Sequence, residues 1–246
     1  MAVPPPIEAY DELDSTNAEA RRRAEAGASG PVWITAARQS AGRGRRGRAW
    51  STETGNLAAS LLTTTDVPAA EAAQLSFVAA LAACDLADTC LGEGVARLKW
   101  PNDVLVAGRK AVGILVESGT QGDGRLWLAV GIGVNLAHHP KDTERPATAF
   151  AEHMSGPPPK PLDALAVLAG QFEIWRSLWS RQGFLPIAAA WTARAHGLGM
   201  RCEARLPNRT LCGTAEGLDM DGALRLRLDG GRLERITAGD VFFEGP

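Results

Sequence analysis

The residue types best suited to binding an anion are concentrated in one short stretch of this chain, residues 39–50. Four arginines lie within six residues there, and glycines separate them, in the order Gly42, Arg43, Gly44, Arg45, Arg46, Gly47, Arg48. Arginine carries a permanent charge on a planar fork of donors that fits carboxylate and phosphate. Glycine lets backbone N–H groups approach an anion closely. The stretch predicts a loop that closes over an anionic ligand. The alternatives are a segment that binds nucleic acid nonspecifically and a solvated basic loop.

Polar side chains also interrupt two apolar runs, residues 97–106 and 110–117. They are Lys99, Asn102, Asp103 and Lys110. A polar group on the buried face of a strand costs free energy unless it has a partner. Lys110 is therefore either part of a binding site or a solvated lysine on an edge strand.

Short polar residues precede a helix that the sequence predicts over residues 11–26. Ser15, Thr16 and Asn17 are all suited to cap a helix, and Glu19 follows Thr16 at the spacing of a capping box. The same side chains could present donors and acceptors to a ligand. Both interpretations stay open from these residues alone.

A central strand is predicted over residues 126–136. Gly131 and Gly133 within it suggest that a ligand or another part of the chain approaches the backbone closely. Asn135, near its end, could offer its amide to a nucleobase or cap the next turn.

The remaining elements must position these groups. Strands are predicted at 31–37 and 57–62 on either side of the arginine-rich loop, and a helix with an apolar stripe at 69–91. The runs 97–106 and 110–117 predict a β-hairpin, with a kink or bulge at Pro101. Two helices follow, one with an apolar stripe over 165–179 and one at 184–195.

The end of the chain has a different pattern. Short strands are predicted at 200–206, 209–218, 223–228, 232–237 and 240–243. Several short strands in so few residues are typical of a small SH3-like β-barrel. We therefore predict a domain boundary near residue 198, with one domain over 1–198 and a second over 199–246.

Composition restricts the class of protein. The 246 residues carry a formal net charge of -2, which argues against a general nucleic-acid binder and leaves the arginine-rich loop as a local cationic patch. The N-terminus has no signal-peptide pattern, and Asp85 and Asp88 interrupt the longest apolar run, so no membrane span is predicted.

The cysteines and histidines predict no metal site. The four cysteines show no C-x-x-C pair and are interpreted as buried thiols in a reducing cytoplasm. His138 and His139 have no third ligand at metal-binding spacing. We expect a cytoplasmic protein with no tightly bound metal.

Five of these segments, in this order, resemble the biotin protein ligases. They are Asp14–Asn17, Gln39–Trp50 with its Gly/Arg run, Lys99–Asp103, Lys110 with Gly113–Leu115, and Gly131–Asn135. The resemblance runs from Asp14 to Glu244. It implies an α+β fold, in which a central mixed β-sheet flanked by helices, like that of the class II synthetases, precedes the SH3-like barrel.

The resemblance also implies an activity. Biotin and ATP would form biotinyl-5′-adenylate and pyrophosphate, and a lysine of a biotin carboxyl carrier domain would then attack the mixed anhydride and release AMP. The implied partners are biotin, ATP with Mg²⁺, and the biotin carboxyl carrier protein of acetyl-CoA carboxylase or a related carboxylase. Two anions must meet in the first step, so fixed cations in a dry site are needed.

The family pattern assigns roles to individual residues. The implied biotin site consists of Ser15, Thr16, Asn17, Gln39, Arg43, Gly44, Arg45 and Lys110. The implied ATP and adenylate site consists of Arg43, Arg45, Arg48, Trp50, Asn102, Asp103 and Asn135. Lys110 and Arg45 are the implied catalytic residues. Lys110 would stabilise the developing negative charge, and Arg45 would restrain the adenylate until the carrier docks. Asp103 would either orient Lys110 or approach Mg²⁺.

Some family members carry an N-terminal winged-helix domain and repress transcription. Few residues precede Asp14 here, so we expect a short form that does not bind DNA. A monomer and a homodimer both fit the sequence. The competing functions are a lipoate or octanoyl ligase or transferase of the same scaffold, a nucleic-acid-binding module that uses the arginine-rich loop, and a biotin sensor that does not turn over ATP.

Overall fold

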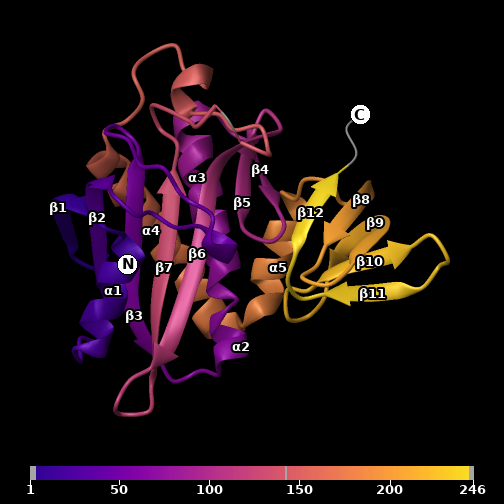
Figure 1. Cartoon of the computed structure of the whole chain (residues 1–246), viewed down its shortest axis with the longest axis horizontal. Coiled ribbons are helices and arrows are strands. Elements are labelled where there is room, and N and C mark those ends of the chain that lie inside the picture. Colours follow the sequence, from indigo (N-terminus) through magenta and orange to yellow (C-terminus); the bar gives the residue numbers. More distant parts are fainter. Residues whose placement is uncertain (1–3, 142, 244–246) are drawn as a thin grey trace.

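A computed structural model describes residues 4–141 and 143–243, and it contains two β-sheets (Figure 1). The large sheet has seven strands in the order β1-β2-β3-β7-β6-β5-β4. They are β1 (Ile7–Leu13), β2 (Val32–Gln39), β3 (Leu57–Thr65), β4 (Ala96–Lys99), β5 (Asp103–Val106), β6 (Arg109–Thr120) and β7 (Leu126–Val134). The pair β1–β2 is parallel and the other pairs are antiparallel, so the sheet is mixed, as expected.

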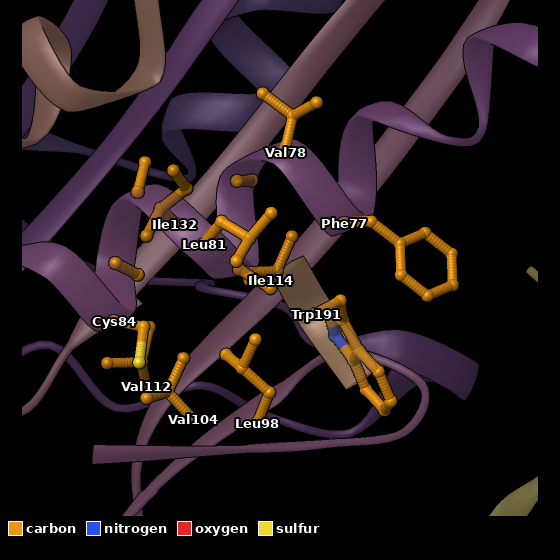
Figure 2. Close-up of a cluster of buried hydrophobic side chains, with 14 of the residues drawn as sticks. Phe77, Val78, Leu81, Cys84, Leu98, Val104, Val112, Ile114, Ile132 and Trp191 are labelled. Carbon is orange, nitrogen blue, oxygen red and sulfur yellow. The ribbon is translucent and has the colours of Figure 1, made fainter. Parts of the chain in front are cut away.

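Helices cover both faces of this sheet. They are α1 (Thr16–Glu25), α2 (Ala69–Ala72), α3 (Leu75–Leu91), α4 (Pro161–Gln182) and α5 (Phe184–Ala193), with short 3-10 turns η1 (Arg45–Gly47) and η2 (Phe150–His153). One face packs against α3 and α4 and forms the main core. Figure 2 shows Leu81 of α3 lying against Ile114 and Ile132 of the sheet, and Val78 belongs to the same core cluster.

The opposite face is only partly covered. Helix α1 packs there through Ala20 and Ala24 against Ile34, Leu62 and Ala129. Side chains of a strand alternate between the two faces. The β7 residues that follow Ala129 on this face are therefore free to line a cavity beyond the end of α1.

The second sheet forms the C-terminal domain, beside the β4–β5 side of the large sheet (Figure 1). Its strands, in the order β11-β10-β9-β8-β12, are all antiparallel. They are β8 (Arg201–Arg205), β9 (Thr210–Leu218), β10 (Leu224–Leu228), β11 (Leu233–Ile236) and β12 (Asp240–Phe243). This antiparallel sheet agrees with the expected SH3-like fold. The boundary at residue 198 stays a prediction, and the outer limits of the two predicted domains, residues 1 and 246, lie outside the described residues.

The start of the chain differs from the prediction. Residues 7–13 form strand β1, and helix α1 begins at Thr16 with Ser15 as its N-cap. The Ser15 hydroxyl accepts from the Ala18 N–H at 3.4 Å. Glu19 is therefore not at the third helical position and pairs with arginines of the helix instead of closing a capping box.

The segment around Pro101 also differs. The chain does not kink within one strand but reverses, so that β4 and β5 pair antiparallel with Lys99 opposite Asp103. The predicted hairpin is formed by β5 and β6. Ala107 and Gly108 make its turn, and both have positive φ, as a two-residue hairpin turn requires.

The apolar segment Ala69–Leu91 is divided into α2 and α3. By length and a mean hydropathy of 1.3 it could cross a membrane, but 61% of its apolar window is buried in the protein. Helix α3 packs between the sheet and α4, so core packing accounts for its composition.

Only some of the four cysteines are buried, although the sequence predicted burial for all of them. Cys84 and Cys202 are buried, whereas Cys90 is half-buried and Cys212 is exposed. Burial raises the pKa of the Cys84 thiol to about 12, so it is an unreactive part of the core. Cys212 is exposed because it lies on the outer face of β9, where the short sheet buries alternate residues only.

Candidate active site

A cavity of about 350 Å³ lies on the partly covered face of the large sheet, beside the N-terminus of α1. Every site residue predicted from the sequence lines it. These residues are Ser15, Thr16, Asn17, Gln39, Arg43, Gly44, Arg45, Arg48, Trp50, Asn102, Asp103, Lys110 and Asn135. They come from α1, the arginine-rich loop, the β4–β5 turn and strands β2, β5 and β6, with Asn135 just beyond β7. The fold thus brings together segments that are far apart in the sequence.

The floor of the cavity requires glycine at two places on β7. A Cβ atom at Gly133 would lie 2.3 Å from the Trp50 ring, and one at Gly131 would lie 2.3 Å from Asn17 Oδ1. The Trp50 ring and the Asn17 amide therefore lie directly on the backbone of β7. The close approach predicted for these glycines is made by Trp50 and Asn17.

One end of the cavity is lined by neutral polar groups. Gln39 Oε1 accepts from the Thr16 backbone N–H at 2.8 Å, and Gln39 Nε2 donates to Thr52 Oγ1 at 2.9 Å. Ser60 Oγ lies 2.6 Å from Asn17 Oδ1 and 2.7 Å from Thr16 Oγ1. Apart from Gln39, which is half-buried, these groups are buried, and all are hydrogen-bonded to one another. Such an end is suited to a neutral polar ring rather than to an ion.

The other end is charged and centres on Lys110. Its Nζ lies 2.5 Å from Asp103 Oδ1 and 5.5 Å from the centre of the Trp50 ring. Lys110 pairs with Leu105 on one side and bridges Ala147 on the other. Strand β6 is therefore interior, and the interpretation of Lys110 as an edge-strand lysine is wrong.

Further cations surround Asp103. Arg145 Nη1 lies 3.4 Å from Asp103 Oδ2, and its guanidinium stacks on Phe242 at 4.3 Å from the ring centre. Burial, together with the charge of Arg145, lowers the pKa of Lys99 to about 8. Lys99 and Arg145 also line a second cavity of about 200 Å³. Positive charge gathered in this way can hold a polyanion.

The arginine-rich loop is folded back on itself. The Trp50 N–H donates to Gly42 O at 2.9 Å, and the Gly44 N–H donates to Arg48 O at 2.7 Å. A Cβ atom at Gly42 would lie 2.4 Å from Trp50 O, so glycine is required there. The loop thereby directs its arginines toward the cavity and the C-terminal domain.

Asp240, at the start of β12, holds two of these arginines. Its carboxylate accepts from Arg48 Nη2 at 2.8 Å and from Arg46 Nη1 at 3.1 Å. Burial opposes ionisation of Asp240, but the hydrogen bonds from Arg48 and the nearby arginine charges outweigh it, and the pKa is lowered. The C-terminal domain therefore forms part of the wall of the cavity.

Arg45 connects three parts of the protein. It donates to Asn102 Oδ1 at 3.1 Å, in the β4–β5 turn, and to Gly239 O at 3.2 Å, in the C-terminal domain. Burial lowers its pKa, but arginine remains charged at any physiological pH. Arg45 is the loop arginine whose contacts span the cavity.

Asn135 is fixed by the neighbouring chain. Its Nδ2 donates to Thr148 O at 3.1 Å, and its backbone oxygen accepts from the Phe150 N–H at 2.9 Å. Of the two interpretations of Asn135, the geometry favours the one in which it holds the following turn. It still lines the cavity beside Trp50.

Sequence reasoning missed Ser60, Arg145 and Asp240. Ser60 lies within an apolar strand, and this buried hydroxyl was the one available signal. Asp240 lies 192 residues from its partner Arg48, and nothing local to either residue indicates the contact. Among the described residues, no group of three or more His, Cys, Asp or Glu side chains could hold a metal ion. His139 instead contacts a carboxylate, with its Nε2 2.5 Å from Glu152 Oε1.

Known proteins share this architecture. Residues 11–135 match the Biotin/lipoate A/B protein ligase family, and residues 197–244 match the Biotin protein ligase C terminal domain. The chain belongs to this family.

Family members resemble the chain over almost its whole length. The biotin--[acetyl-CoA-carboxylase] ligase of Paracoccus denitrificans is 46% identical over 94% of this chain and 98% of its own. The biotin protein ligase of Aquifex aeolicus, in complex with biotin and ATP, superposes with a TM-score of 0.82 at 25% identity, over 97% of this chain and 98% of that chain. The Leishmania major ligase in complex with biotinyl-5-AMP gives a TM-score of 0.68 at 26% identity, over 96% and 100%. The expected fold class and family are confirmed.

Proposed function

We propose that this chain is an ATP-dependent biotin protein ligase, which converts biotin to biotinyl-5′-AMP and then transfers biotin to a lysine of a carrier domain. One observation carries the assignment. The Paracoccus denitrificans ligase is 46% identical over 94% of this chain and 98% of its own. The lipoate alternative is not favoured, because the C-terminal segment matches a domain of biotin protein ligases.

The polarity of the cavity orients biotin. The neutral end, with Asn17, Thr16 and Gln39, suits the ureido ring, and Lys110 at the charged end suits the carboxylate. The apolar ring system and chain of biotin would lie between them, over Leu115 and the backbone of Ile132. The carboxylate is thereby directed at the place where the nucleotide phosphates bind.

In the first step, a carboxylate oxygen of biotin attacks the α-phosphorus of ATP. An acyl–phosphate bond forms and the bond to pyrophosphate breaks. Lys110 offsets the negative charge that gathers between the two anions, and its ion pair with Asp103 at 2.5 Å holds it in place. A cation that is already positioned needs no reorganisation when the charge develops.

The arginine-rich loop would bind the nucleotide. Arg43, Arg45 and Arg48 lie around the cavity, and we propose that Arg48 exchanges the Asp240 carboxylate for a phosphate. Trp50 and Asn102 would shape the nucleotide side. Closure of the loop also excludes water, which would otherwise hydrolyse the adenylate.

ATP would bind as its magnesium complex, so the metal is part of the substrate. A magnesium–nucleotide complex needs only one or two protein carboxylates in addition to the phosphates, and Asp103 supplies one at the cavity wall. When bound, the ion neutralises phosphate charge.

In the second step, the ε-amino group of the carrier lysine attacks the carbonyl carbon of the adenylate, and AMP leaves with the C–O bond electrons. The implied acceptor is the biotin carboxyl carrier protein of acetyl-CoA carboxylase or a related carboxylase. We propose a cytoplasmic location, which fits the free thiols of Cys84, Cys90 and Cys212.

The proposal predicts that the protein biotinylates a biotin carboxyl carrier domain. After incubation with biotin and MgATP, mass spectrometry should show the carrier heavier by one biotinyl group. A carrier whose acceptor lysine is replaced by arginine, and a reaction without ATP, should show no change. Transfer of lipoate in preference to biotin would overturn the assignment.

Gly131→Ala should weaken biotin binding selectively. The added Cβ would lie 2.3 Å from Asn17 Oδ1 and would push the amide out of place. Misplacing a buried hydrogen-bonded group costs ~1–3 kcal/mol, so KM for biotin should rise by about 10- to 100-fold. KM for ATP should change little, because Asn17 lies at the other end of the cavity.

Steady-state pyrophosphate release checks this prediction. Gly170→Ala in α4 is the matched control, because its Cβ would meet nothing within 4 Å. An unchanged KM for biotin in Gly131→Ala would mean that Asn17 does not contact the ligand.

A further inference from the structure

Glu117, on β6, lies behind the neutral end of the cavity without lining it. Its Oε2 accepts from Asn17 Nδ2 at 2.8 Å, and the same nitrogen donates to Leu115 O at 3.3 Å. Both hydrogens of the Asn17 amide are therefore directed at β6. Leu115 and Glu117 share one face of the strand, since their side chains are two residues apart.

The carboxylate fixes which end of the Asn17 amide faces β6. An ionised carboxylate only accepts hydrogen bonds, whereas an amide both donates and accepts. The NH₂ group must therefore face Glu117, and the oxygen must face the other way. Asn17 Oδ1 lies over Gly131, on the floor of the cavity, and accepts from Ser60 Oγ at 2.6 Å.

The direction set by Glu117 extends to the Ser60 hydroxyl. Ser60 has one hydroxyl hydrogen, and Asn17 Oδ1 takes it at 2.6 Å. The Thr16 hydroxyl lies 2.7 Å from Ser60 Oγ and 3.2 Å from Gln39 Oε1, and its own hydrogen goes to one of these two oxygens. In either case no hydrogen of Thr16 is left for the cavity. The lone pairs left at the cavity, on Asn17 Oδ1 and Thr16 Oγ1, are acceptors.

We propose that Glu117 is a positioning residue that makes the cavity select a ring bearing N–H groups. This inference rests on the proposed function and specifies how the ureido ring of biotin is recognised. Acceptors that are fixed by an anion can bind a ring N–H, but they cannot turn to satisfy a ring oxygen. A ligand that lacks the N–H leaves them unpaired, and a buried site built to hydrogen-bond a group rejects ligands without it strongly.

Glu117→Gln tests this assignment, with biotin and an analogue in which one ureido N–H is replaced by oxygen. Glutamine has the same size but can donate, so the Asn17 amide can turn over. KM for biotin in pyrophosphate release should rise about tenfold, and the preference for biotin over the analogue should fall by a similar factor. The kcat value and KM for ATP should stay within about twofold, because no group at the charged end has changed.

A reciprocal exchange provides the rescue. Asn17→Asp alone places two carboxylates against each other and should bind biotin poorly. When Asn17→Asp is combined with Glu117→Gln, the introduced glutamine amide can donate to the introduced carboxylate, whose oxygens again present acceptors to the cavity. The double variant should recover the preference for biotin over the analogue. Glu12→Gln, a charge loss on the exposed strand β1, is the matched control and should behave as wild type.

Unchanged KM and unchanged preference in Glu117→Gln would overturn the assignment. Equal losses with biotin and the analogue, together with a lower melting temperature, would also overturn it by showing a purely structural role. Failure of the proposed function is a separate result, because the wild-type protein would then release no pyrophosphate in the presence of biotin.

Discussion

Replacing Lys110 by alanine is expected to abolish formation of the biotinyl adenylate. Lys110 is the cation placed between the neutral end of the cavity and its arginines, with its Nζ 2.5 Å from Asp103 Oδ1. Removing one fixed donor that stabilises developing charge costs about 10²- to 10³-fold in kcat. Two full anions must meet in this reaction, so we expect a loss at the upper end of that range.

The fold should survive this change at a measurable cost. The Lys110 side chain is 28% exposed, so little packing is lost, but Asp103 is only 3% exposed and would lose its nearest cation. Arg145, at 3.4 Å from Asp103, remains as a partner. A moderate fall in melting temperature is therefore expected in Lys110→Ala, and Lys110→Ala with Asp103→Asn should reverse part of it.

Biotin-dependent pyrophosphate exchange measures the effect on the chemistry. Lys160→Ala, at an exposed position just before α4, is the matched control and should keep wild-type activity. Near-normal exchange in Lys110→Ala would remove Lys110 from the catalytic machinery and leave its contact with Asp103 as a structural ion pair.

Local patterns in the sequence predicted the elements with strong signals. Two apolar runs around the turn at Ala107–Gly108 predicted the hairpin of β5 and β6, and five short strands predicted the C-terminal sheet. Strand β1 was missed because most of its residues are exposed on an edge, where selection for an apolar face is weak. The reversal at Pro101 was missed because a chain reversal and a strand kink look alike in sequence.

The site residues were predicted from the order of the family motifs, and the fold explains why that order suffices. The motifs lie at strand ends that meet at one edge of the large sheet, or at the ends of elements beside that edge. Pairing of the strands therefore brings the motifs together. Contacts between residues that are far apart in the sequence and belong to no motif have no such signal. Asp240 is one aspartate among many until β12 places it against Arg48, and Glu117 resembles a solvated strand residue until α1 places Asn17 above it.

Replacing Arg45 by glycine is expected to release the adenylate before the carrier arrives. Arg45 holds the loop to Asn102 at 3.1 Å and to Gly239 at 3.2 Å, so it joins the loop, the β4–β5 turn and the C-terminal domain. A hydrogen bond from a charged donor contributes ~1.5–3 kcal/mol, and losing this restraint should speed adenylate release by about 10- to 100-fold. The freed adenylate is a reactive acyl donor and should biotinylate lysines of bystander proteins.

The expected phenotype is a separation of the two half-reactions. Lys110 remains in place in Arg45→Gly, so pyrophosphate release should continue. The amount of adenylate retained after rapid gel filtration should fall, and biotin should appear on an added bystander protein.

Arg46→Gly is the matched control in the same loop. Arg46 pairs with Asp240 but does not line the cavity, and its φ of 57° is one that glycine adopts readily. If Arg45→Gly retained the adenylate as well as Arg46→Gly and the wild type, the barrier to release would lie elsewhere in the loop. Leakage of the adenylate from Arg45→Gly alone would assign the barrier to Arg45, which joins the loop, the β4–β5 turn and the C-terminal domain.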